Sequence, residues 1–233
     1  MGYREHAPPQ ALAPWLACVW EREAEAGAPV RVIPDGCIDI VWTEGAGTRV
    51  VGANSTAFEV SLAEGTHVIG VRMRPGTAPA LLGVPGEAVV DARPELHEVW
   101  GDDGARLAEA LERATAPRRV VVEELIRRPA EAPDRLVGEA VARLRRGAAV
   151  ADVARELFVS ERQLRRRITS AVGYGPKRLS RVLRLQRALD RARAGEELAR
   201  VAFEAGYADQ AHFTNDCVEL AGVPPTSVFS KSP

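Results

Sequence analysis

The stretch SERQLRRRITSAV, residues 160–172, decides how the rest of the chain is read. On a helix, Leu164, Ile168 and Val172 recur four residues apart and form one apolar seam. The side chains that would project from the other side are mostly cationic: Arg162, Gln163, Arg165, Arg166 and Arg167. Taken alone, this pattern also fits an ordinary helix with a solvated charged face.

The residues just before this stretch predict a second, shorter helix. ADVARELF, residues 151–158, has an amphipathic pattern, and Val159 with Ser160 forms a tight break in which Ser160 serves as N-cap. A short helix, a tight break and an arginine-bearing helix together indicate a helix-turn-helix unit for DNA binding.

A repeat inside the C-terminal part favours DNA binding over a merely solvated face. VADVARELFVSERQLRRRITSAVGYGP is similar to LARVAFEAGYADQAHFTNDCVELAGVPP, with Ala154 matching Ala202 and Phe158 matching Gly206 at a spacing of 48. At a spacing of 49, Leu164 matches Phe213, Gly173 matches Gly222 and Pro176 matches Pro225. The helix predicted at residues 176–194 would be a rod of about 28 Å between the two units. Two recognition helices placed so would reach major grooves about 34 Å apart, one DNA turn.

Charge is distributed unevenly along the chain. Residues 134–233 hold 18 Lys and Arg against 12 Asp and Glu, whereas residues 1–133 hold 13 against 20. A polyanion-binding domain joined to a non-binding one has this asymmetry. RPAEAPDR, residues 128–135, carries two prolines at the point of change and is the predicted linker.

The N-terminal part predicts a β-rich domain closed by helices. Strand-like runs cover residues 30–33, 38–42 and 49–51, and the segment around Trp15 and Trp20 fits a short helix or a strand. In HVIGVRMRPG, Ile69, Val71 and Met73 would share one face of a strand, with Arg72 and Arg74 on the other. Helices are predicted at residues 105–114 and 118–128. The fold class is therefore α+β, with residues 1–130 as a β-rich sensing and dimerisation domain and residues 131–233 as an all-α DNA-binding domain.

Composition and motifs argue against several other classes. Apolar residues make up 46% of the 233 residues, and no apolar run approaches the roughly 18 residues of a membrane span. No secretory signal is visible, so a cytoplasmic protein is expected. The sequence has no HExxH, GxSxG, Walker or Rossmann motif, and its histidines lack metal-ligand spacing, so no enzyme activity, metal or cofactor is expected. Asp35, Cys37 and Asp39 are better explained by a turn at Pro34-Asp35-Gly36 and a small core cysteine.

The C-terminal hundred residues resemble the DNA-binding domain of AraC/XylS-type transcription regulators. The resemblance rests on GYADQAHFTNDC…GVPPTSVF, residues 206–229, which combines the turn glycine, the DQxHF run and the G-x-x-P ending. The N-terminal half resembles the sensor portion of a less studied subgroup, notably in VIPDGCIDIVW and GVRMRPG. This implies a first helix-turn-helix unit at about residues 149–173, a linking helix at about 176–194 and a second unit at about 197–222.

The resemblance also implies site residues. In the first unit Arg162, Gln163, Arg165 and Arg166 would meet DNA, and in the second unit Gln210, Ala211 and Asn215. Arginine can pair with guanine, glutamine and asparagine with adenine, and alanine can touch a thymine methyl group. The resemblance implies no known ligand for the N-terminal half; an effector pocket is expected near Trp42, Arg72 or Arg74.

Two departures from the family pattern affect the expected DNA contacts. Phe158 stands where the family has glycine, and it would be strained if that turn needs a positive φ. The acids Asp209, Asp216 and Glu219 lie on or beside the second recognition helix, where they would repel phosphates, although Asp209 also suits an N-cap. The expectation is that the first unit dominates affinity.

Three functions stay open at this point. The leading one is a DNA-binding transcription regulator that responds to a small-molecule effector, with activation or repression unassigned. The expected partners are double-stranded DNA, an unidentified effector, a second copy bound through residues 105–128, and RNA polymerase; no membrane partner is expected. The alternatives are a DNA-targeted enzyme of the alkyl-damage acceptor type and an interaction protein with a degenerate DNA-binding domain. Cys18, Cys37 and Cys217 cannot supply the four-cysteine zinc site that the enzyme would need.

Overall fold

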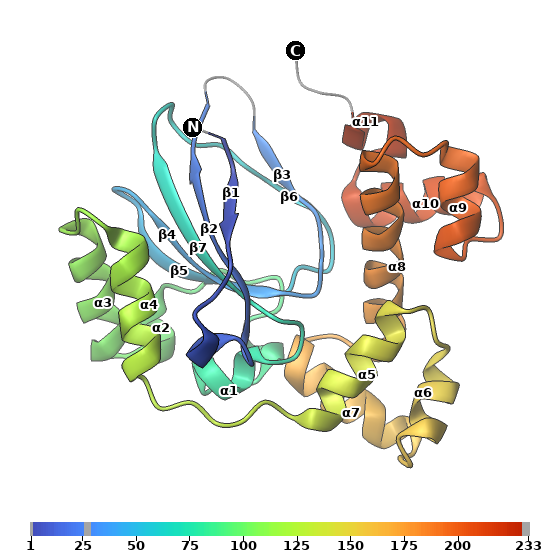
Figure 1. Ribbon diagram of the computed structural model, residues 1–233, viewed down its shortest axis with the longest axis horizontal. Coiled ribbons are helices and arrows are strands. Elements are labelled where there is room, and N and C mark those ends of the chain that lie inside the picture. Colours follow the sequence, from blue (N-terminus) through green and yellow to red (C-terminus); the bar gives the residue numbers. More distant parts are fainter. Residues whose placement is uncertain (1, 26–28, 230–233) are drawn as a thin grey trace.

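The N-terminal part of the protein is built on an antiparallel sheet (Figure 1). In this computed structural model, which describes residues 2–25 and 29–229, the strand order is β1-β2-β7-β4-β5. A second, two-stranded sheet pairs β3 with β6. The strands are β1 (Arg4–His6), β2 (Leu16–Glu23), β3 (Val30–Val32), β4 (Ile38–Thr43), β5 (Gly47–Val51), β6 (Phe58–Val60) and β7 (His67–Met73).

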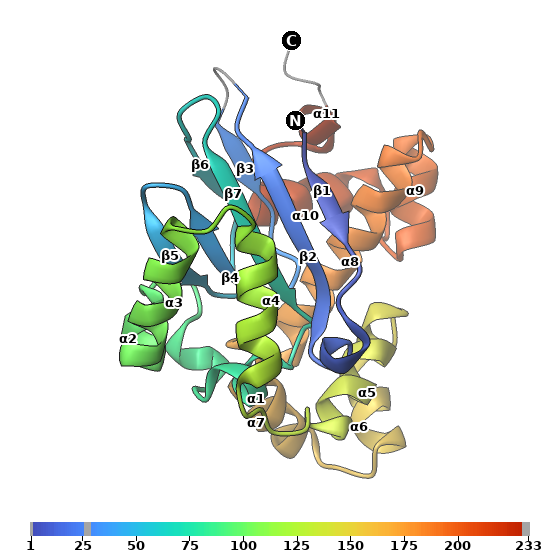
Figure 2. The same cartoon turned by 60° about the vertical axis from the view of Figure 1, so that its left-hand side comes forward.

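Short helices pack around the large sheet, and the last three of them cover one of its faces. They are η1 (Gln10–Leu12), α1 (Ala78–Leu82), η2 (Gly86–Ala88), α2 (Leu96–Trp100), α3 (Asp102–Glu112) and α4 (Pro117–Arg127). Figure 2 shows α4 running along the sheet beside α3. Val71, Ile40 and Trp42 are buried in this layer, and the Trp42 Nε1 donates to the Glu112 carboxylate of α3 at 2.8 Å. The predicted β-rich region closed by helices is therefore confirmed.

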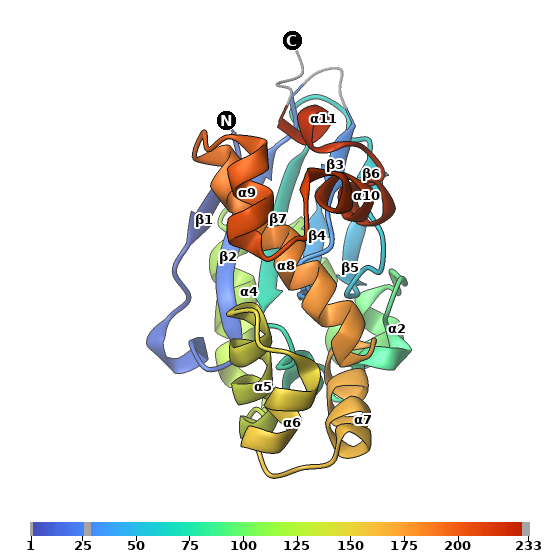
Figure 3. The ribbon, with the colours of Figure 1, turned by 90° about the vertical axis from the view of Figure 1, so that its right-hand side faces the viewer.

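The C-terminal part is entirely helical. Its helices are α5 (Arg135–Arg145), α6 (Val150–Glu156), α7 (Glu161–Val172), α8 (Pro176–Arg193), α9 (Leu198–Ala205), α10 (Gln210–Ala221) and α11 (Pro225–Phe229). The long α8 joins the pair α6–α7 to the pair α9–α10, which lie toward its opposite ends (Figure 3). Residues 128–134, between α4 and α5, form neither helix nor strand.

The structure decides two predictions for the N-terminal part, the segment around Trp15 and Trp20 and the turn at Pro34-Asp35-Gly36. The segment around Trp15 and Trp20 enters a strand, β2, and the Pro34-Asp35-Gly36 turn is present, with the Asp35 carboxylate accepting from the Cys37 backbone N–H at 2.8 Å. Trp20 crosses Gly70 of β7 so closely that a Cβ on Gly70 would lie 2.0 Å from its indole ring.

Candidate nucleic-acid interface

The first helix-turn-helix unit consists of α6, a short turn and α7. Ser160 is the N-cap of α7, and its hydroxyl accepts from the Gln163 N–H at 3.2 Å while the Gln163 Oε1 accepts from the Ser160 N–H at 2.9 Å. This reciprocal capping box fixes where α7 begins. Leu164 and Ile168 are completely buried, as the apolar seam predicts.

The outer face of α7 carries three exposed arginines, Arg162, Arg165 and Arg166. Among the residues that the structure describes, none of the three is paired with a carboxylate, whereas most arginines of the chain are. Arg167 differs, since it pairs with Asp134 at 3.1 Å. Helical spacing places Arg162, Arg165 and Arg166 on one side, so α7 presents a concentrated positive charge to solvent.

The turn before α7 has an unusual conformation at Phe158. Its φ is 54°, and the matching residue of the second unit, Gly206, has a φ of 85°. Both turns therefore require the left-handed region, which costs a residue other than glycine about 1–2 kcal/mol. Phe158 is also 95% exposed, so its ring gains almost no burial within the fold.

The second helix-turn-helix unit consists of α9, a turn and α10. Asp209 is the N-cap of α10, and its carboxylate accepts from the His212 N–H at 2.7 Å. Gln210, Ala211 and Asn215 are exposed. The spacing of four between Ala211 and Asn215 puts them on the same side of the helix.

Of the two acids on α10, Asp216 is buried and Glu219 is half-exposed. The two carboxylate oxygens of Asp216 accept from Arg181 at 2.6 Å and from Arg184 at 2.7 Å. Burial would raise the pKa of Asp216, but these two hydrogen bonds outweigh it and lower the pKa. Glu219 accepts from Arg181 at 2.5 Å. Arginines of α8 therefore pair with both acids, which weakens the repulsion of phosphates expected from the sequence. That the first unit dominates affinity stays a prediction.

The arginines of α8 bind other parts of the protein. Besides Arg181 and Arg184, Arg187 donates to the Arg145 carbonyl at 2.6 Å and to the Ala205 carbonyl at 3.1 Å. Those carbonyls belong to the last residues of α5 and α9, whose C-terminal carbonyls lack partners within the helix. The guanidinium groups of α8 therefore hydrogen-bond to three neighbouring helices, α5, α9 and α10.

Contacts from the sheet domain hold the ends of both α7 and α10. The Ala57 N–H donates to the Leu220 carbonyl at 2.7 Å, and Arg31 donates to the Ala221 carbonyl at 3.1 Å, both at the end of α10. At the end of α7, Gly173 packs so tightly on Gly86 that a Cβ on Gly86 would lie 2.8 Å from the Gly173 nitrogen. The two helix-turn-helix units are thus positioned partly by the N-terminal half.

A cavity of about 860 Å³ lies between the sheet domain and helices α5 and α8. Arg72 and Arg74 line it from the sheet side, and Val141 and Gln186 line it from the two helices. Trp42, the third residue expected in an effector pocket, does not belong to its lining. It is buried against α3 on the opposite face of the sheet.

A polar cluster surrounds Arg72 at the wall of this cavity. The Arg72 Nε lies 3.6 Å from the Asp35 carboxylate and 3.4 Å from the Asp39 carboxylate. Asp39 also accepts from the Trp20 Nε1 at 2.9 Å. Burial raises the pKa of Asp39 to about 6, although the Arg72 charge opposes this shift. Of these four residues, Arg72 and Asp35 belong to the cavity lining.

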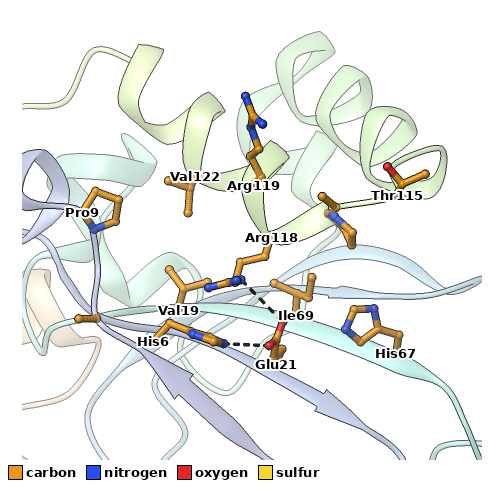
Figure 4. A pocket seen from close by; sticks show the side chains of 13 residues that line it. His6, Pro9, Val19, Glu21, His67, Ile69, Thr115, Arg118, Arg119 and Val122 are labelled. Carbon is orange, nitrogen blue, oxygen red and sulfur yellow. Dashed lines mark hydrogen bonds and ion pairs between the residues drawn. The ribbon is translucent and has the colours of Figure 1, made fainter. Parts of the chain in front are cut away.

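A smaller cavity of about 420 Å³ lies between strands β1, β2 and β7 and the start of α4 (Figure 4). Glu21 accepts from the His6 Nε2 at 2.8 Å, and the Arg118 Nε lies 3.7 Å from the same carboxylate. Val19 and Ile69 form an apolar part of its lining. Burial would raise the pKa of Glu21, but His6 and Arg118 together lower it.

The cysteines do not have the properties of a nucleophile. Burial raises the pKa of Cys18 and of Cys217 to about 11, and it also raises the pKa of Cys37. A reactive cysteine needs a lowered pKa, so these thiols behave as core residues or, for Cys18 and Cys37, as part of the interdomain cavity wall.

Among residues 2–25 and 29–229, no group of three or more His, Cys, Asp or Glu side chains is arranged to hold a metal ion. Within the same residues, no helix combines the length and apolar character that a membrane crossing needs.

Comparison with protein families divides the chain in two. Residues 134–231 match a family described as "Helix-turn-helix domain", and residues 4–95 match a "Domain of unknown function (DUF6597)". A comparison with curated protein sequences found no match.

Solved structures are similar to both parts. Apo ToxT K231A from Vibrio cholerae strain SCE256 is 12% identical and covers 90% of this chain and 96% of its own, with a TM-score of 0.50. An AraC-type transcriptional regulator from Chromobacterium violaceum is 23% identical and covers 40% of this chain and 87% of its own, with a TM-score of 0.38. Unsaturated fatty acid-bound wild-type ToxT is 13% identical and covers 90% of this chain and 92% of its own, with a TM-score of 0.43. The chain therefore has the two-domain fold of ToxT, with a β-rich N-terminal part that contains the DUF6597 match and a C-terminal region that is a helix-turn-helix domain.

Proposed function

We propose that this protein is a cytoplasmic transcription regulator that binds double-stranded DNA sequence-specifically and responds to a small-molecule effector. One observation carries the proposal: Arg162, Arg165 and Arg166 are exposed on one face of α7 and lack carboxylate partners among the described residues. Unpaired guanidinium groups on a helix that protrudes from a helix-turn-helix unit suit guanine edges and phosphates in a major groove.

In this proposal the second unit also reads bases. Three residues of α10 are exposed: Gln210, Ala211 and Asn215. The acids that follow them on the same helix, Asp216 and Glu219, are paired with arginines of α8. This weakens the reason for regarding α10 as repelled by DNA. Gln163 has a smaller part, because its side-chain carbonyl serves the capping box and only its amide nitrogen is available to DNA.

Residues 1–130 would act as the sensing and dimerisation domain and residues 131–233 as the DNA-binding domain. We place the effector in the interdomain cavity near Arg72 and Arg74, since a ligand there would touch the sheet and helices α5 and α8 together. Binding at such a junction would change how firmly the helix-turn-helix units are held, and differential binding to two arrangements is what a regulatory ligand needs. Trp42 is left out because it lies on the other face of the sheet.

Two further partners belong to the proposal. The helices α3 and α4, which carry most of the predicted dimerisation segment of residues 105–128, lie on the outside of the sheet domain (Figure 2), where a second copy could pack. RNA polymerase would be the third partner of a regulator bound near a promoter. Light scattering at high protein concentration would detect the dimer, and a strict monomer would contradict that part.

A mobility-shift titration with the DNA upstream of the protein's own gene tests the DNA-binding function. Because phosphate contacts release counterions, we expect the affinity to fall steeply and linearly in a log–log plot as salt rises from about 50 to 200 mM. Binding without any preference over random DNA would remove sequence specificity from the proposal. Failure to bind any DNA at low salt would instead support an interaction protein with a degenerate domain.

The effector cavity needs a separate test. Thermal-shift measurements against a panel of small organic acids, amines and neutral metabolites should find compounds that raise the melting temperature. Ala142→Trp, which places an indole inside the cavity lining, should abolish those shifts and leave DNA binding at low salt intact. Shifts that persist unchanged in Ala142→Trp would place the ligand elsewhere.

A further inference from the structure

Phe158 combines two features that the fold itself does not use. Its backbone has a φ of 54°, and its side chain is 95% exposed. The other described non-glycine residue with a positive φ, Asp91, makes local use of its conformation, since its carboxylate accepts from the Ser55 N–H at 2.6 Å. The Phe158 ring has no comparable partner in the described structure. Gly206 shows that the same turn can be made without strain.

Strained backbone that serves no packing purpose points to a function for the side chain. Phe158 lies two residues before the N-cap Ser160, in the turn that leads directly into α7. This α6–α7 connection forms one end of the molecule, away from the sheet domain (Figure 3). Whatever approaches the exposed face of α7 therefore also approaches the turn that carries Phe158.

The charges near this turn indicate what that partner is. Arg162, Arg165 and Arg166 are unpaired among the described residues, whereas the acids of α6 are already neutralised. Asp152 pairs with Arg155 at 2.7 Å, and Glu156 pairs with Arg143 at 3.0 Å. A polyanion fits this surface, and DNA also offers apolar groups beside its phosphates, namely thymine methyl groups and the faces of deoxyribose rings.

We propose that Phe158 makes an apolar contact with DNA at the edge of the major groove that α7 enters, and that this contact contributes to sequence preference. The proposal rests on the DNA-binding function proposed above. The contact explains why the strained conformation is kept. Glycine would relieve the strain at this position but has no side chain that could reach the DNA.

Substitution at this position separates the contact from the stability of the fold. Phe158→Gly and Phe158→Asn both suit a left-handed turn and remove the ring. We expect each to raise the melting temperature by roughly 2–4 °C, because the strain is relieved. We expect each to weaken binding to a DNA site selected by the wild-type protein from a random library by about fivefold to tenfold. Phe158→Leu keeps an apolar side chain and should retain most of the affinity.

The matched control is Phe203→Ala on α9. It also removes an exposed aromatic ring, which is 79% exposed and belongs to the second helix-turn-helix unit. It should leave binding unchanged. Because no phosphate contact is lost, the salt dependence of binding should be the same for Phe158→Gly as for the wild type. Replacing thymine by uracil in the selected site tests the sequence preference. A loss seen with the wild type and not with Phe158→Gly indicates a contact with the methyl group, whereas no loss in the wild type would overturn the contribution to sequence preference and leave only a contact with deoxyribose.

The failures of the two proposals can be told apart. Wild-type affinity in Phe158→Gly, or an equal loss in Phe203→Ala, would overturn the role of Phe158 while the protein still binds DNA. A wild-type protein that selects no DNA site would overturn the proposed function itself.

Discussion

The Arg181 Nη2 of α8 lies 2.6 Å from the Asp216 Oδ1 of α10, and this ion pair joins the linking helix to the second helix-turn-helix unit. The side chain of Asp216 is 5% exposed, and Arg184 binds its other carboxylate oxygen at 2.7 Å. Arg184 in turn lies 4.2 Å from the centroid of the Tyr207 ring, a cation–π contact in the turn between α9 and α10. The Asp216 carboxylate therefore contributes to the position of α10 on α8.

Asp216→Ala should lower the free energy of unfolding by about 2–4 kcal/mol, since it leaves the partly buried Arg184 guanidinium without a carboxylate and Arg181 with Glu219 alone. Urea denaturation measures this loss. Glu219→Gln is the control, because half of the Glu219 side chain is exposed and its pairing should contribute less than about 1 kcal/mol. The hydrogen bonds that lower the pKa of Asp216 outweigh the effect of burial, so its contribution is present above the unfolded pKa and is lost only in stronger acid. The cost of Asp216→Ala should therefore be the same at pH 6 and pH 8.

The arginines of α7 should be essential for DNA binding. Arg165→Glu or Arg166→Glu replaces an unpaired positive charge by a negative one, and either should abolish detectable complexes at salt concentrations where the wild type binds. Arg165→Ala should cost about 1–3 kcal/mol if the guanidinium reads a guanine, and it should relax the preference at one base pair. Mobility shifts with the selected site and with single-base variants measure both effects. Arg49→Glu, an exposed charge reversal on β5, should bind normally; normal binding by both α7 reversals would reject α7 as a recognition helix.

The sequence predicted α7 well and the role of α8 poorly, for a physical reason. A seam at intervals of four residues and an N-cap are local features, so Leu164, Ile168 and Ser160 could be assigned from their neighbours. The partners of Arg181, Arg184 and Arg187 lie at least 18 residues away in the chain, and no local pattern distinguishes an arginine that holds a helix from one that binds phosphate.

Strand register explains why Arg72 lines the interdomain cavity, as expected for an effector pocket, and Trp42 does not. Alternation places Arg72 opposite Ile69, Val71 and Met73, as predicted, but the face of Trp42 depends on how β4 pairs with β7. In the structure Trp42 pairs with Ile69 and Asp39 with Arg72, so Trp42 belongs to the helix-covered face. The short strands β1 and β6, three residues each, were missed because so few residues show no periodicity.

Asp39 should make the protein more stable in mild acid. Burial raises its pKa to about 6 against the charge of Arg72, from an ordinary value of 3.8. Between these values the folded protein holds a proton that the unfolded chain has released, so this group's contribution falls as pH rises through the window, by about 3 kcal/mol in all. Asp39→Asn removes the titration, so the wild type should lose stability relative to this variant between pH 4 and pH 6. Asp103→Asn, at an exposed acid, should follow the wild-type profile in urea denaturation from pH 4 to 7; parallel profiles for Asp39→Asn and the wild type would contradict this account.

Gly86 should be required for the junction between the sheet domain and α7. An added Cβ would lie 2.8 Å from the Gly173 nitrogen and 2.9 Å from the Val172 carbonyl carbon, and these backbone atoms cannot rotate away as a side chain could. Gly86→Ala must therefore push the end of α7 off the sheet domain, at a cost of about 1–3 kcal/mol. Gly138→Ala is the control, because its Cβ on α5 meets no atom within 4 Å, and alanine within a helix should stabilise the protein slightly. Hydrogen exchange at residues 169–173 should become faster in Gly86→Ala and stay the same in Gly138→Ala.

The same substitution should affect DNA binding, because the junction helps to orient the first helix-turn-helix unit relative to the second. Gly86→Ala should weaken binding to a DNA site that spans both units more than it weakens binding to a half-site. An equal effect on the two sites would mean that the sheet domain has no part in the arrangement of the two units.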